Sequence, residues 1–205
     1  LEARAKRDFR YVRARNPWST ELSFVFAPNS NINNGSAQER SYLYHVYDAV
    51  FGGPIEYDLS GASQALSGFE FGGTLRTRYR FRETRQTAQD LKFGLSYRSF
   101  VMSSGAKSQA PGVRGSDFAF GTASFGYGHR RRNFDRRGEL KSDLELGQSW
   151  YGGARYATYL RGSVQQTYRA SAQRQFSFSV NGERLWGQAT PDVDTVALSG
   201  SMSQR

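Results

Sequence analysis

The sequence predicts an all-β protein, a transmembrane antiparallel up-and-down β-barrel of about eight strands. Apolar and polar residues alternate in segment after segment, which is typical of strands with one apolar and one polar face. Aromatic residues reach 15% and glycines number 22, although only 38% of the 205 residues are hydrophobic. The mean hydropathy is −0.67. A transmembrane barrel places its apolar band on every second residue, so its average hydropathy resembles that of a soluble protein.

The clearest alternation is Leu-Arg-Thr-Arg-Tyr-Arg-Phe-Arg at residues 75–82. On a strand, successive side chains point to opposite faces, so the four arginines share one face. The segment 91–98 alternates in the same way. We therefore expect a basic ladder that faces a water-filled lumen and comprises Arg76, Arg78, Arg80, Arg82, Lys92 and Arg98.

The chain begins with residues of high helix propensity. Leu1, Ala5, Phe9 and Val12 recur at near-helical spacing, and the Asn-Pro pair at 16–17 ends the pattern. We expect residues 1–16 to form a short N-terminal helix that closes a preceding helical domain, and residues 17–205 to form the barrel. No signal peptide opens the chain, so we expect its biological start to lie further upstream.

The barrel strands follow in order. The first carries Trp18, Leu22, Phe24 and Phe26 on one parity. After residues 75–82 and 91–98, the other alternating segments are 118–130, 140–150, 156–165, 176–181 and 196–203. In 118–130 the parity slips around Gly121, which predicts a bulge or a glycine kink.

The connections are of two kinds. Residues 28–66 form the longest stretch without clean alternation, and 102–116 is predicted as a second loop. Shorter connections are expected at 83–90, 131–138, 151–155, 170–174 and 182–192. The last alternating segment runs to the end of the chain, and an open strand edge is not viable in a bilayer. We therefore expect a barrel that is incomplete at its C-terminus and belongs to a larger one.

The formal net charge is +10, and 24 of the 28 basic residues are arginine. A nucleic-acid-binding protein gathers such charge in one patch with stacking aromatics. Here the arginines occupy alternate strand positions or predicted turns such as 130–132, so no nucleic-acid partner is expected. We expect the turn clusters to meet lipopolysaccharide phosphates or other anionic lipid head groups of the cell outer membrane.

The sequence does not favour an enzyme. Cysteine is absent, which excludes disulfides and thiolate metal sites. His45 and His129 are the only histidines, and no Gly-x-Ser-x-Gly motif occurs. We therefore expect no catalytic residue, no metal and no cofactor.

Two short motifs are more distinctive than the alternation. The first strand ends in Ala27 followed by Pro28, Asn29, Ser30, Asn31, Ile32 and Asn33. Residues 65–72 then read Ala-Leu-Ser-Gly-Phe-Glu-Phe-Gly, just before the arginine alternation. With the basic helix and the Asn-Pro break, this order resembles the C-terminal barrel of the surface lipoprotein assembly modifier family of Gram-negative bacteria. The resemblance covers essentially the whole chain in order and pattern.

The resemblance implies a periplasmic helical repeat domain, of which residues 1–16 would be the last helix, followed by an outer-membrane barrel. It implies a translocation module that exports or displays lipoproteins, or related haem- and metal-acquisition proteins, with the client and the helical domain as partners. Residues 28–33 are carried over as the family motif, and a capped turn at the end of strand one is the alternative. The alternative function is a passive porin-like channel that attracts anions.

Overall fold

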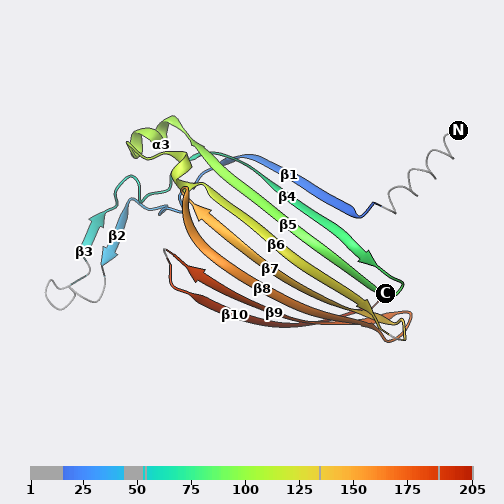
Figure 1. Cartoon of the computed structure of the whole chain (residues 1–205). Helices are drawn as coiled ribbons and strands as arrows, with labels where there is room; N and C mark the ends of the chain where they lie inside the picture. Colours follow the sequence, from blue (N-terminus) through green and yellow to red (C-terminus); the bar gives the residue numbers. More distant parts are fainter. Residues whose placement is uncertain (1–15, 44–52, 54, 134, 189, 205) are drawn as a thin grey trace.

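The computed structural model describes residues 16–43, 53, 55–133, 135–188 and 190–204 (Figure 1). The helix predicted at residues 1–16 lies outside the described residues, apart from Asn16. Among the described residues, no helix is both long and apolar enough to cross a membrane.

Eight strands form one antiparallel sheet whose order follows the chain, β1-β4-β5-β6-β7-β8-β9-β10. The strands are β1 (Trp18–Asn29), β4 (Gly68–Glu83), β5 (Thr87–Met102), β6 (Phe120–Arg132), β7 (Gly138–Tyr151), β8 (Ala154–Arg169), β9 (Arg174–Gly187) and β10 (Val193–Gln204). The predicted all-β class, the up-and-down order and the eight strands of the sheet are confirmed.

The sheet is curved but not closed. Side chains from β1, β4, β5, β6, β7, β8 and β9 line one common hollow, which requires the sheet to curl around it. Among the described residues, β1 and β10 are the two edges and do not pair with each other (Figure 1). The structure therefore contains the curved antiparallel sheet of the predicted barrel without its closure.

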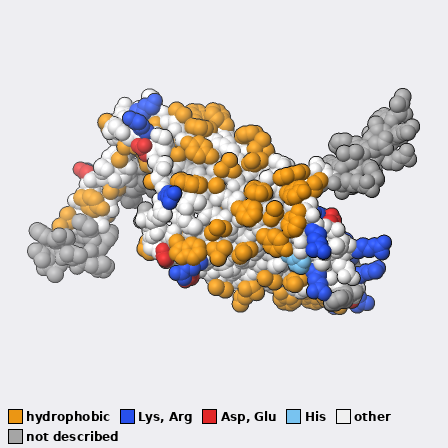
Figure 2. Space-filling model, viewed as in Figure 1, with side chains coloured by type: hydrophobic (Ala, Val, Ile, Leu, Met, Phe, Trp, Pro, Cys, Tyr) orange, Lys and Arg blue, Asp and Glu red, His pale blue; other side chains and the backbone are white. Residues whose placement is uncertain are grey.

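The outer face of the sheet is apolar and exposed. Leu22, Leu75 and Leu95 lie directly opposite one another on β1, β4 and β5, as the alternation predicts. Phe24 is 79% exposed and Leu198 76%. Figure 2 shows hydrophobic side chains scattered over the whole visible outer surface of the sheet.

The two ends of the sheet differ. At one end, here called the turn end, connections 84–86, 133–137 and 170–173 join consecutive strands. The opposite end, called the loop end, carries the long connections 30–67 and 103–119 and the short ones 152–153 and 188–192. β1 begins and β10 ends at the turn end.

The long loop-end connections contain structure that alternation alone did not indicate. Within 30–67, β2 (Arg40–Leu43) and β3 (Ile55–Asp58) form a hairpin. Hydrogen bonding to Glu56, followed by the charges of Glu56 and Asp58, raises the pKa of Arg40. Within 103–119, α3 (Ser104–Gln109) begins at a cap in which the Ser103 side chain accepts from Ala106 N, and the 3₁₀ turn η1 (Gly115–Phe118) precedes β6.

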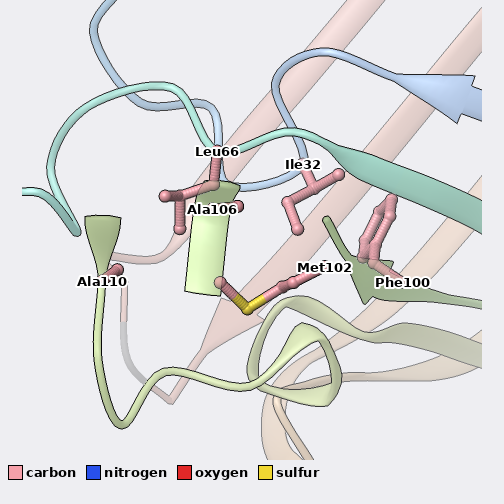
Figure 3. Packing of buried hydrophobic residues seen from close by; sticks show 6 residues of the cluster. All are labelled: Ile32, Leu66, Phe100, Met102, Ala106 and Ala110. Carbon is pink, nitrogen blue, oxygen red and sulfur yellow. The ribbon is translucent and has the colours of Figure 1, made fainter. Parts of the chain in front are cut away.

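A small hydrophobic core joins these connections to the sheet. Its members come from the connection after β1, the residues before β4, the end of β5 and α3, and Leu66 is fully buried. Figure 3 shows the cluster of Ile32, Leu66, Phe100, Met102, Ala106 and Ala110. Because the polar face of the sheet supplies little apolar packing, this cluster anchors the loop end.

Two details of register differ from the sequence prediction. The slip expected around Gly121 is wrong, since β6 pairs with β5 and β7 without interruption there. β6 begins at Phe120, which lies opposite Arg98 on the polar face. Register shifts lie elsewhere. In β4 the register shifts between Arg80 and Arg82 and leaves Phe81 without a direct partner on β5, and a second shift lies between Ser149 and Trp150 in the pairing of β7 with β8.

Candidate functional site: the polar face of the sheet

The concave face of the sheet encloses a hollow of about 680 Å³, called here the polar hollow. Small polar side chains from β1, β4, β5, β6 and β7 supply part of the lining. The charged lining residues are Glu21, Arg76, Arg78, Lys92, Glu145, Arg161 and Glu183. Acidic and basic groups therefore face the same water-accessible space.

Three residues of the predicted ladder line the polar hollow: Arg76, Arg78 and Lys92. Their positions follow from register, because Arg78 lies opposite Lys92 and Arg76 lies opposite Gly94 on the same face. Arg78 Nη1 lies 4.0 Å from Asp90 Oδ2, and Arg78 Nε is buried without a hydrogen-bond partner among the described residues. Lys92 pairs with Asp143 on β7.

The other three ladder residues are placed differently. Arg80 is held by carboxylates, with Nε 2.8 Å from Asp90 Oδ1 and Nη1 3.2 Å from Glu83 Oε2. The bulge pairs Arg82 with Gln89, one residue out of the alternation, and Arg82 is exposed. Arg98 lies outside the polar hollow, with its guanidinium 5.5 Å from the centre of the Phe120 ring.

The opposite wall carries a charge network that sequence reasoning missed. Arg161 on β8 lies between two acids, with Nε 2.6 Å from Glu183 Oε2 and Nη1 3.6 Å from Glu145 Oε1. Glu145 and Glu183 each lie at a position that the alternation of their strand assigns to the polar face. Only the register of β7, β8 and β9 places both of them directly opposite Arg161. The hollow is therefore basic along β4 and β5 and mixed along β7 to β9.

Tyr159 completes this wall. Its hydroxyl lies 3.3 Å from Glu145 Oε1, and the Arg161 guanidinium lies 4.9 Å from the centre of its ring. The ring covers Gly147, its direct neighbour on β7. A Cβ at position 147 would overlap the Tyr159 ring, so glycine is the residue that lets the aromatic side chain lie flat across the strand.

The asparagine-rich motif of residues 28–33 lies at the loop end, away from the lining of the polar hollow. Pro28 and Asn29 end β1, and the Asn29 amide donates to Glu70 Oε2 over 3.1 Å. Asn29 Oδ1 accepts from Asn31 N, with Ser30 between the two residues. Asn31 Nδ2 donates to the Gly35 carbonyl, with the buried Ile32 between them. These contacts form a turn capped by side chains.

Asn33 fixes this turn to the distant segment before β4. Its Nδ2 donates to the carbonyls of Ala62 at 2.9 Å and Gln64 at 2.8 Å. Its Oδ1 accepts from Leu66 N at 2.9 Å and Gly35 N at 3.3 Å. The side-chain amide of Asn33 thus donates two hydrogen bonds and accepts two, all with backbone groups of the protein. These contacts correspond to the capped turn named above as the alternative interpretation of residues 28–33.

Among the described residues, no group of three or more His, Cys, Asp or Glu side chains could hold a metal ion. His129 lies on β6 opposite Gln89 and Ser142, and His45 lies outside the described residues.

No family model, no curated protein and no solved structure matches the chain.

Proposed function

We propose that the curved sheet is part of an outer-membrane β-barrel that serves as a translocation module for surface lipoproteins or related secreted proteins. One observation carries the membrane part of this proposal. The apolar side chains lie on the outside of the curved sheet and the polar ones on the inside, the reverse of a soluble protein. Apolar side chains cover most of the convex face and stay exposed, whereas charged and hydroxyl groups supply most of the lining of the concave one. A barrel with lipid outside and water inside requires this arrangement.

The strand dimensions support the same proposal. A tilted strand crosses a membrane with ~9–11 residues, and the shortest strands of the sheet, β1 and β10, have 12. Aromatic pairs flank the aliphatic band of the outer face. Trp18 and Tyr79 lie toward the turn end with ring centres 4.6 Å apart, and Phe26 and Phe69 lie toward the loop end at 5.7 Å. Such girdles mark the two interfaces of transmembrane barrels.

The translocation part of the proposal rests on the order of the motifs around β1 and β4. The resemblance to the lipoprotein assembly modifier barrels makes a lipoprotein client the first partner to test. The polar hollow suits a passing chain, because charges of both signs and hydroxyl groups contribute to its walls beside a few apolar side chains such as Phe120 and Leu185. No covalent step is required of the barrel.

A porin-like channel is the second candidate. Arg76, Arg78 and Lys92 form a basic strip along one wall of the hollow, and such a strip attracts small anions. The two functions differ in what crosses the membrane, so one assay separates them.

The test is client display in a Gram-negative host. The full-length protein is expressed beside a lipoprotein encoded next to it, and protease accessibility of the lipoprotein is measured on intact cells. We expect display only when the barrel protein is present. We also expect the double variant Arg76→Glu/Arg78→Glu to reduce display several-fold without loss of barrel assembly, because it reverses the basic strip.

Lys107→Glu/Arg114→Glu is the matched control, because it reverses two exposed basic residues of the loop end that do not line the hollow. Equal display with both double variants would remove the basic strip from the mechanism. An inserted barrel that leaves the lipoprotein protected but conducts anions would favour the porin-like function.

A further inference from the structure

The charge of the molecule is distributed unequally between the two ends of the sheet. The turn-end segments 82–87, 130–139 and 169–174 contain nine arginines and three acidic residues. The loop-end connections 30–67, 103–119 and 188–192 contain three basic and six acidic residues. Figure 2 shows Lys and Arg side chains gathered where the turns lie. The turn-end segments therefore carry a net charge of +6, whereas the loop-end connections carry −3.

Two neighbouring turns form a basic hollow at this end. It has a volume of about 650 Å³ and is lined by Thr84, Arg85, Gln86, Arg132, Asn133 and Arg136. A backbone hydrogen bond of 2.7 Å from Arg132 N to the Gln86 carbonyl joins the two turns. Arg136 adopts a left-handed conformation with φ of 59° and donates from its backbone N to the Asn133 carbonyl. The guanidinium groups of Arg85, Arg132 and Arg136 are therefore held by two turns whose backbones are hydrogen-bonded.

The acidic residues of the turn end are already engaged. Glu83 pairs with Arg80, and Glu139 pairs with Lys141 and lies 3.9 Å from Arg130. Asp135 Oδ1 accepts from the backbone N of Arg137. Among the described residues, Arg85, Arg132 and Arg136 form no ion pair with these acids.

The basic hollow lies next to the apolar outer face. Trp18 packs on Tyr79 near the start of β1, and the rings of Phe81 and Tyr127 lie 6.4 Å apart toward the same end. In a membrane, an aromatic girdle lies at head-group level, and cations just beyond it meet the lipid phosphates. This step rests on the proposed transmembrane barrel.

We propose that Arg85, Arg132 and Arg136 bind the phosphate groups of phospholipid head groups in the leaflet at the turn end. Short turns mark the periplasmic side of outer-membrane barrels, which makes that leaflet the periplasmic one. Guanidinium groups suit this ligand because they donate two parallel hydrogen bonds to phosphate oxygens. The contact fixes the depth and orientation of the barrel.

The test compares the full chain in vesicles of phosphatidylcholine alone, of phosphatidylcholine with phosphatidylglycerol, and of phosphatidylcholine with lipopolysaccharide. Insertion is followed by protease protection and by the fluorescence of the three tryptophans. Stability is followed by urea unfolding at low and high salt. The variant is Arg85→Gln/Arg132→Gln/Arg136→Gly, in which glycine keeps the left-handed turn.

We expect phosphatidylglycerol to raise the ratio of folded to unfolded protein by at least tenfold, and on the order of one hundredfold at low salt. The variant should lose most of this gain, and high salt should remove it. The control Lys107→Gln/Arg114→Gln/Arg155→Gln removes the same charge at the loop end and should keep the gain.

Other outcomes overturn the proposal. Equal losses in the two triple variants would show an effect of net charge alone. A gain restricted to lipopolysaccharide would assign the basic hollow to the other leaflet. An inserted chain that shows no lipid dependence would refute this inference and leave the barrel proposal standing, whereas a chain that does not insert into any vesicle would refute both.

Discussion

Asn33 shows how one residue of the asparagine-rich motif organises the loop end. Its side-chain amide forms hydrogen bonds with four backbone groups, which would otherwise lack these partners in a partly buried turn. We predict that Asn33→Ala lowers the free energy of unfolding by ~1–3 kcal/mol, because buried backbone groups lose their partners. Limited proteolysis should show faster cleavage within residues 30–67.

The matched control is Asn34→Gly. Asn34 has φ of 52°, which glycine adopts without strain, and it makes no side-chain hydrogen bond among the described residues. If both variants unfold at the same urea concentration, the four hydrogen bonds of Asn33 do not hold the loop end.

Gly147 is a second position where a small substitution should change stability. We predict that Gly147→Ala destabilises the protein by ~1–3 kcal/mol, because the new methyl group overlaps the Tyr159 ring and forces it from its buried place. Gly182→Ala serves as the control, since nothing lies within 4 Å of a Cβ there. Urea unfolding measures both, and equal stability of the two variants would contradict the close packing of Tyr159 on β7.

At the scale of a single strand, neighbouring residues of β9 provide a test of the membrane. Val180 lies on the outer face and is 48% exposed, and Asn181 lies on the same face as Glu183 of the polar hollow. We predict that Val180→Arg costs ~2–4 kcal/mol in a bilayer, as charges at the lipid-facing midplane do. Asn181→Arg should be nearly neutral. On a soluble sheet, both exposed substitutions would stay within about 0.5 kcal/mol, so equal effects would argue against lipid at the outer face.

Alternation is a local property of a strand, and this explains which elements were predictable. The faces of β4, β5 and β9 could be assigned from sequence because every second residue repeats the same chemistry. Register depends on pairing between strands, and the sequence does not encode it locally. For this reason the bulge after Arg80, which takes Arg82 out of the ladder, was not foreseen.

The candidate site was predictable on one wall only. Arg76, Arg78 and Lys92 stand out because they lie on strands with strict alternation. The network of Arg161 with Glu145 and Glu183 joins residues from three strands, and each of them alone looks like an ordinary polar position. The role of Asn33 was hidden for the same reason, since its partners lie about thirty residues away in the chain.

At the scale of the whole molecule, the width of the lumen decides whether a protein can pass. Side chains largely fill the interior of an eight-stranded barrel, whereas larger barrels leave an aqueous channel. A bilayer does not tolerate free edges, so β1 and β10 each need a partner in the proposed membrane barrel. Translocation therefore requires that further strands, rather than the opposite edge, pair with β1 and with β10.

This requirement can be tested with cysteine pairs, because the chain has no cysteine of its own. Ser179 and Ser199 lie opposite each other on β9 and β10 with hydroxyl groups 2.6 Å apart, so Ser179→Cys/Ser199→Cys should oxidise readily in the membrane-inserted protein. We predict that pairs joining Ser19 or Ser23 of β1 to Ser199 or Ser203 of β10 do not form disulfides, as gel mobility with and without reductant would show. Efficient cross-linking of any such pair would mean that the sheet closes on itself as an eight-stranded barrel. Its lumen would then be too narrow for a client chain, and the export proposal would fail while the membrane barrel itself remained.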